Sequence, residues 1–174
     1  MQPSSHYIQC DDFSVHYTAW GNPTAPAVIA WHGLARTGRD FDTLAQRLSQ
    51  HYFVICPDTI GRGLSQWCHN PHEDYCLATY AKHALALMDG LHIEQAHWIG
   101  TSMGGNIGMV CAAGLALPAF KGRLRSLLLN DIAPDISSAA VERIKTYAGQ
   151  PPAFDTMPEL EAFFRQVYAL SLIH

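Results

Sequence analysis

Short apolar runs alternate along this chain with segments whose apolar residues recur every three or four positions. Runs of this kind suit strands buried on both faces, and the recurring spacing is typical of helices with one buried face. The runs are residues 27–31, 52–56, 96–99 and 124–129, and the helical segments between them are 41–48, 77–91 and 103–117. Because strands and helices alternate, the sequence predicts an α/β fold with a mostly parallel sheet and helices on both faces.

The two ends of the chain depart from this alternation. Residues 7–10 and 13–19 read as strands joined by a tight turn, which predicts an antiparallel hairpin at one edge of the sheet. Beyond Pro134, two helical segments follow one another without an intervening strand. We therefore predict a core over residues 1–136 and the beginning of a helical lid over residues 137–174.

The second lid helix carries the residue types of a substrate pocket. It begins with a Thr and a Glu three positions apart, Thr156 and Glu159, which is the pattern of a capping box. Phe163 and Phe164 then lie on its apolar face. Such a face is first of all a packing surface, but in a lid it also predicts contacts with the substrate.

A serine stands where a nucleophile is expected in a parallel sheet. Residues 100–104 read G-T-S-M-G and match the pattern G-x-S-x-G between a predicted strand and a predicted helix. A tight strand-to-helix turn brings the residues two before and two after Ser102 close together, so both must be small, and Gly100 and Gly104 meet this need. The turn also places Ser102 at the N-terminus of the helix, where negative charge is favoured. We predict that Ser102 is the nucleophile and that the Met103 N–H donates to an oxyanion.

The loop after the first buried strand offers a second donor. Residues 32–34 read H-G-L, and the N–H of Leu34 is well placed in sequence to complete an oxyanion hole. We assign His32 and Gly33 to the substrate-binding loop. His32 is not expected to be the general base, because it precedes Ser102 in the chain.

Together with the stretch D-T-I-G-R-G-L-S at residues 58–65, these motifs resemble the α/β-hydrolase superfamily. The chain looks most like the lidded branch that contains serine esterases, carbon–carbon bond hydrolases and haloperoxidase-like enzymes. The resemblance implies a structural role for Asp58, Arg62 and Ser65. It also implies hydrolysis of an ester or similar acyl bond without a cofactor or metal.

The sequence offers no good candidate for the catalytic base. A serine hydrolase of this kind needs an acid and then a histidine after the serine. The one histidine that follows Ser102 is His174, the last residue, and Asp131 after the fourth strand is the best acid present. We therefore expect a chain that stops within the lid. The strand at residues 124–129 would then form an open sheet edge, through which the chain could self-associate.

Composition excludes several other classes of function. The formal net charge is −4 and no long basic run is present, so neither nucleic acid nor an anionic membrane surface is expected as a partner. The uncharged stretch 98–120 is long enough to cross a bilayer, but its glycines favour a strand, turn and helix. With no secretory signal visible, a cytoplasmic protein is expected. Residues 69–74 gather metal-ligand types but read as a solvated loop.

The preferred prediction is thus a serine ester hydrolase acting on a small molecule through an acyl-enzyme on Ser102, with weak or no activity in this chain itself. Two alternatives remain open. One is a non-catalytic fragment or a short form that binds a small ligand in the same cleft. The other is a hydrolase that cleaves the carbon–carbon bond of a diketone with the same serine.

Overall fold

The protein is described here by a computed structural model that covers residues 2–114, 117–135, 137–148 and 153–167. Strands and helices follow each other in the predicted order. The strands are β1 (Ser4–Cys10), β2 (Phe13–Trp20), β3 (Ala27–Trp31), β4 (Phe53–Pro57), β5 (Ala96–Thr101) and β6 (Leu124–Asn130); the helices are α1 (Asp42–Leu48), α2 (Pro71–Asp74), α3 (Leu77–Gly90), α4 (Met103–Ala113), α5 (Ser138–Ala148) and α6 (Met157–Val167), with short 3-10 helices η1 (Gly38–Phe41) and η2 (Pro118–Phe120).

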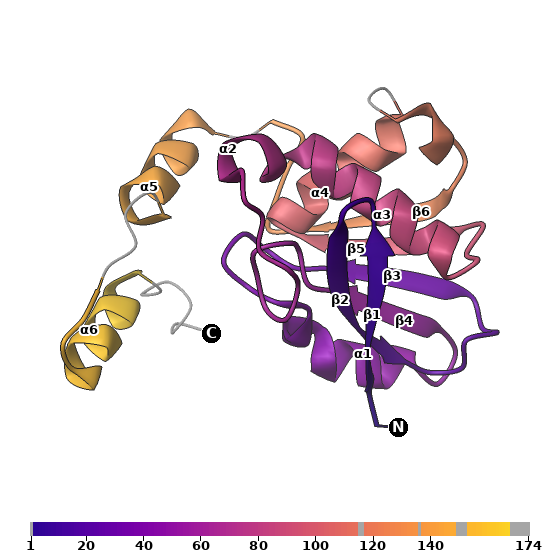
Figure 1. Ribbon diagram of the computed structural model, residues 1–174, viewed down its shortest axis with the longest axis horizontal. Coiled ribbons are helices and arrows are strands. Elements are labelled where there is room, and N and C mark those ends of the chain that lie inside the picture. Colours follow the sequence, from indigo (N-terminus) through magenta and orange to yellow (C-terminus); the bar gives the residue numbers. More distant parts are fainter. Residues whose placement is uncertain (1, 115–116, 136, 149–152, 168–174) are drawn as a thin grey trace. The chain divides into compact units, whose positions relative to one another are not determined.

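The strands form one six-stranded sheet in the order β1-β2-β4-β3-β5-β6 (Figure 1). Strands β4, β3, β5 and β6 run parallel. The hairpin of β1 and β2 joins them antiparallel through β4. This arrangement confirms the predicted mostly parallel sheet with an antiparallel hairpin at one edge.

Helices cover both faces of the sheet because alternate strand residues point to opposite sides. On one face, α3 and α4 pack over a core that includes Ile29, Ile55 and Trp98. On the other face, α1 packs over Val28 and Val54, the neighbours of those residues in sequence. Strands β3 and β4 are buried on both sides, which explains their continuous apolar runs.

One predicted helix is shorter in the structure. The helix expected over 103–117 ends at Ala113, because Gly114 adopts a left-handed conformation with φ of 61° and caps it. Strand β6 lies at the edge of the described sheet, as expected for the strand at residues 124–129, and Leu128 is 53% exposed. No helix in the described parts of the chain is long and apolar enough to cross a membrane.

The chain divides into two compact units, residues 1–134 and 135–174. The first unit holds the whole sheet with α1 to α4. In the second unit, α5 and α6 follow each other, and the Oγ1 of Thr156 accepts a hydrogen bond from the N–H of Glu159 at 3.4 Å. The division falls two residues before the boundary expected from sequence. The function of the second unit as a lid stays a prediction.

Candidate active site

Ser102 occupies a sharp turn between β5 and α4. Its backbone has φ of 49° and ψ of −112°, a conformation that L-residues rarely adopt. The turn is held by hydrogen bonds: the N–H of Ser102 donates to the carbonyl of Asn130 at 2.9 Å, and its own carbonyl accepts from the N–H groups of Gly105 and Asn106. A strained residue held so firmly at a strand end is a candidate functional position.

The two glycines of the motif are required by close backbone contacts. A Cβ atom on Gly100 would lie 2.3 Å from the carbonyl oxygen of Gly104. A Cβ atom on Gly104 would lie 2.1 Å from the carbonyl oxygen of Trp31, at the end of β3. Any side chain at these positions would push α4 away from the strands, so the turn depends on glycine at both.

The loop after β3 lies beside Ser102, as the sequence motifs suggested. A Cβ atom on Gly33 would be 3.7 Å from the Cβ of Ser102. Strands β3 and β5 pair in parallel, and the rings of Trp31 and Trp98 on these strands stack with centroids 5.3 Å apart. Leu34 is 39% exposed and Met103 is buried. That the N–H groups of Leu34 and Met103 form an oxyanion hole stays a prediction.

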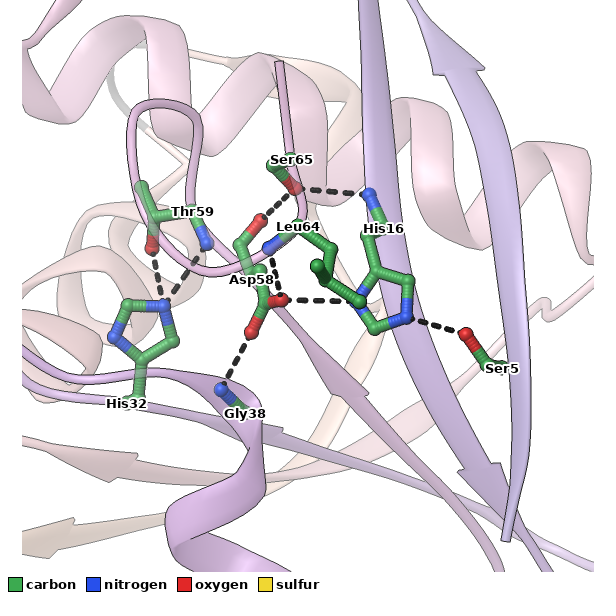
Figure 2. A network of polar contacts seen from close by, with 8 residues as sticks. All are labelled: Ser5, His16, His32, Gly38, Asp58, Thr59, Leu64 and Ser65. Carbon is green, nitrogen blue, oxygen red and sulfur yellow. Dashed lines mark hydrogen bonds and ion pairs between the residues drawn. The ribbon is translucent and has the colours of Figure 1, made fainter. Parts of the chain in front are cut away.

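His32 anchors this loop from inside the protein. Its side chain is fully buried, and its Nε2 accepts hydrogen bonds from the N–H of Thr59 at 2.9 Å and from the Thr59 hydroxyl at 3.0 Å (Figure 2). Since Nε2 accepts, Nδ1 carries the proton and donates to the carbonyl of Gly33 at 2.7 Å. Burial also lowers the pKa of the His32 imidazole, which keeps the ring neutral.

Because its ring is enclosed, His32 does not bind substrate directly, contrary to the expectation from sequence. With both nitrogens engaged and no exposed surface, it presents no atom to a substrate. Instead, it holds the carbonyl of the Gly33–Leu34 peptide, whose N–H is the expected oxyanion donor. His32 is therefore a positioning residue of the loop, while Gly33 is the part of the pair that lies against Ser102.

Arg62 ties the same loop to the rest of the core. Its Nε donates to the carbonyl of Leu34 at 3.1 Å, and its Nη1 donates to the carbonyl of Ile60 and the hydroxyl of Tyr80. The guanidinium also lies over the ring of Tyr75, 5.1 Å from its centroid. Arg62 thus has a structural role, because it links two loops and α3 through hydrogen bonds.

Asp131 follows β6, next to the serine turn. Its φ is 55° and its side chain is exposed. The preceding residue, Asn130, contacts the turn twice, because its carbonyl accepts from Ser102 and its Nδ2 donates to the Thr101 hydroxyl at 3.2 Å. The role of Asp131 as triad acid stays a prediction. His174 lies outside the described residues, and no other histidine follows Ser102.

Phe163 and Phe164 belong to α6 in the second unit. Their rings contact each other, with centroids 5.6 Å apart, and Phe154 packs against Phe163 at 5.2 Å. Phe164 is 45% exposed, so an apolar ring of this helix reaches the surface of the unit. Contact between these rings and a substrate remains a prediction.

Three cysteine thiols are enclosed, and the metal-ligand side chains are scattered. Burial raises the pKa of the Cys10, Cys56 and Cys111 thiols to about 12, which makes them unreactive. Within the described ranges, no three His, Cys, Asp or Glu side chains gather as they would around a metal ion. Residues 69–74 were expected to form a loop, but Pro71–Asp74 form the short helix α2.

Sequence reasoning missed the polar partners of Asp58. This carboxylate is buried and contacts Nδ1 of His16 on β2 at 2.8 Å, while Nε2 of the same ring contacts the Ser5 hydroxyl on β1 at 2.7 Å (Figure 2). The Ser65 hydroxyl donates to the Asp58 carbonyl and accepts from the His16 N–H. A histidine within a strand of buried residues was the available signal, since a buried histidine needs polar partners.

Known proteins match this chain over most of its length. The model of a family described as "alpha/beta hydrolase fold" matches residues 26–155. A 3-hydroxybutyrate-oligomer hydrolase from Cupriavidus necator is 43% identical over 173 residues, which are 96% of this chain and 57% of the relative. A 2-hydroxy-6-oxo-2,4-heptadienoate hydrolase from Pseudomonas putida is 26% identical over 92% of this chain and 54% of its own length.

Solved structures agree with these sequence matches. The crystal structure of an alpha/beta hydrolase from Novosphingobium aromaticivorans superposes with a TM-score of 0.79 at 32% identity, covering 94% of this chain and 56% of that protein. The predicted fold class is thereby confirmed. This chain spans a little over half the length of these three proteins.

Proposed function

This chain belongs to the alpha/beta hydrolase fold family, and we propose that it provides the nucleophile of a serine hydrolase that cleaves ester bonds. The observation that carries the proposal is the strained turn at Ser102, held against Gly33 at the carboxyl ends of β3 and β5. Ligands of open α/β sheets bind at this edge. A nucleophile raised on such a turn is accessible to a carbonyl carbon.

In the proposed reaction, the Ser102 Oγ attacks the ester carbonyl carbon and its proton passes to a histidine base. The N–H groups of Met103 and Leu34 stabilise the resulting oxyanion. The alcohol leaves with a proton from the histidine, and water then hydrolyses the acyl-enzyme. His32 and Arg62 hold the carbonyls on either side of Leu34, which keeps this peptide in one orientation.

The base of this reaction is proposed to lie outside the described residues. His174 is one candidate, and a histidine from a segment outside this sequence is the other. Asp131 is the proposed acid, because it follows the strand whose end carries the carbonyl that holds Ser102. A serine at such a turn reacts slowly without its base, so this chain alone is expected to show weak activity.

The similarity to the Cupriavidus necator protein supports a substrate class. This protein is 43% identical over nearly the whole chain. We therefore propose short oligomers of 3-hydroxybutyrate or related hydroxyacid esters as substrates. The Pseudomonas putida relative supports a second candidate, cleavage of a carbon–carbon bond in a diketone, at lower identity. Both reactions would use the same serine.

The deciding experiment is the mass of the intact protein after incubation with a fluorophosphonate. We expect a label on Ser102 that is lost in Ser102→Ala and kept in Ser126→Ala, a matched control with a serine on β6. Folded protein whose Ser102 takes no label would contradict the proposed nucleophile. Hydrolysis of a 3-hydroxybutyrate trimer, compared with that of a dienoate diketone, then separates the two substrate classes.

A further inference from the structure

A second group of serine, histidine and aspartate is joined in series away from Ser102. The Ser5 Oγ lies 2.7 Å from Nε2 of His16, and Nδ1 of the same ring lies 2.8 Å from Oδ2 of Asp58. Figure 2 shows the three side chains in a row across β1, β2 and the end of β4. The order of the contacts is nucleophile, base and orienting acid.

The chemistry of the three groups limits the direction of the hydrogen bonds. An ionised carboxylate only accepts, so Nδ1 of His16 carries a proton and donates a hydrogen bond to Asp58. In the neutral form of the ring, the lone pair is on Nε2. In that form Ser5 donates its hydroxyl hydrogen to Nε2, which is the arrangement that activates a serine for attack.

The base and its acid are rigidly placed. The Asp58 carboxylate also accepts hydrogen bonds from the N–H groups of Gly38 at 2.7 Å and Leu64 at 2.9 Å. A Cβ atom on Gly63 would lie 2.2 Å from Oδ2, so the loop closes directly over the carboxylate. Both His16 and Asp58 are 2% exposed. A base held in one orientation by a fixed acid is what general-base catalysis requires.

Ser5 itself is open to a ligand. It is exposed on β1 and lines a cavity of about 280 Å³ together with His16 and Asp58. Thr37 and Arg39 also line this cavity. The Arg39 guanidinium, which pairs with Asp42, adds a charged side chain to this lining. The volume fits a small acyl group and not a long chain.

We propose that Ser5 is a second nucleophilic serine, activated by His16 and Asp58, that is acylated by small activated esters. The Ser5 Oγ forms a bond to the acyl carbon, the ester C–O bond breaks, and the hydroxyl proton passes through Nε2 of His16 to the leaving alkoxide. With a fluorophosphonate, the Oγ–P bond forms, the P–F bond breaks, and fluoride leaves while His16 keeps the proton. This reaction needs neither Ser102 nor the missing base of the first site.

Ser4 provides a sharp internal control. Its Oγ lies 2.7 Å from Nε2 of His6, so it too contacts a histidine, on the same strand. His6 is exposed, and no carboxylate contact is among those its ring makes in the described structure. If a contact with histidine were sufficient, Ser4 would react as well as Ser5.

The test uses the full chain as Ser102→Ala, as Ser102→Ala with Ser5→Ala, and as Ser102→Ala with Ser4→Ala. We expect one fluorophosphonate label in the first and third proteins, mapped to Ser5, and a labelling rate at least about 100-fold lower in the second. Both added substitutions replace exposed serines of β1, and circular dichroism checks that each variant is folded.

Two results would overturn the proposal: folded Ser102→Ala protein that takes no label, or a label that persists when Ser5 is replaced. The outcome is separate from that of the first site. A label on Ser5 with none on Ser102 in the unsubstituted chain would support this inference and contradict the proposed function, and the reverse pattern would do the opposite.

Discussion

The backbone of Ser102 adopts a strained conformation. Its φ of 49° with ψ of −112° is costly for any residue with a Cβ but accessible to glycine. We expect Ser102→Gly to unfold at a higher urea concentration than Ser102→Ala, by about 1 kcal/mol in the free energy of unfolding.

The control pair for this comparison is Ser126→Gly and Ser126→Ala on β6, where φ is not positive. There the order should reverse, because glycine weakens a strand. Equal stability of the two Ser102 variants would mean that the turn carries no strain.

Two buried histidines predict a loss of stability in mild acid. Burial lowers the pKa of His32 and of His83, whose Nε2 has no hydrogen-bond partner in the described structure. The unfolded chain takes up these protons near pH 6.5, before the folded protein does, so stability falls as the pH drops below about 6.5. Each histidine contributes at most about 1.4 kcal/mol per pH unit.

Urea unfolding between pH 7 and pH 5 measures this effect. We expect His83→Leu to reduce the slope of stability against pH, with the part due to His32 left in place. His51→Gln, a change at an exposed histidine, should leave the slope unaltered. A slope that is the same in His83→Leu as in the unsubstituted chain would refute the role of His83.

The contact of α4 with the strand ends depends on the absence of a Cβ atom at Gly104. Gly104 allows the helix to approach within contact of the Trp31 carbonyl. We expect Gly104→Ala to lower the free energy of unfolding by at least about 2 kcal/mol, because backbone must move to make room.

Gly122→Ala is the matched control. A Cβ atom there meets nothing within 4 Å, and only its φ of 78° opposes the substitution. Its expected cost is about 1 kcal/mol. If thermal or urea unfolding gave the same cost for both glycines, crowding at Gly104 would be excluded as the reason for its presence.

For the molecule as a whole, the open side of β6 is the feature with the largest consequence. This strand pairs with β5 alone among the described strands, and Leu128 on it is 53% exposed. We propose that the chain self-associates through this edge, as apolar edge strands favour.

Sedimentation velocity over a range of concentrations tests this. Leu128→Lys should shift the protein towards monomer, because a charged side chain opposes pairing at an edge. Trp67→Lys, which removes an apolar side chain that is 72% exposed in a loop, should leave the association unchanged. A chain that stays monomeric at all concentrations would contradict the proposal.

The features that could be predicted from sequence are those that neighbouring residues decide. The requirement for small residues around Ser102 follows from the turn itself, and the strands β3 and β4 follow from their continuous apolar runs. The α/β class and the edge hairpin were also predicted correctly. The end of α4 was missed because Gly114, one glycine among several in that stretch, was not recognised as the cap.

The features that only the tertiary structure decided are contacts between residues far apart in the chain. His16 and Asp58 are separated by 42 positions, and no local pattern links them. The enclosure of His32 likewise depends on Thr59, 27 positions away. Periodicity and sterics act within a few residues, whereas the strand order β1-β2-β4-β3-β5-β6 brings distant side chains together. Local sequence therefore determined the turn that carries Ser102, and the sheet order determined which polar groups meet around it.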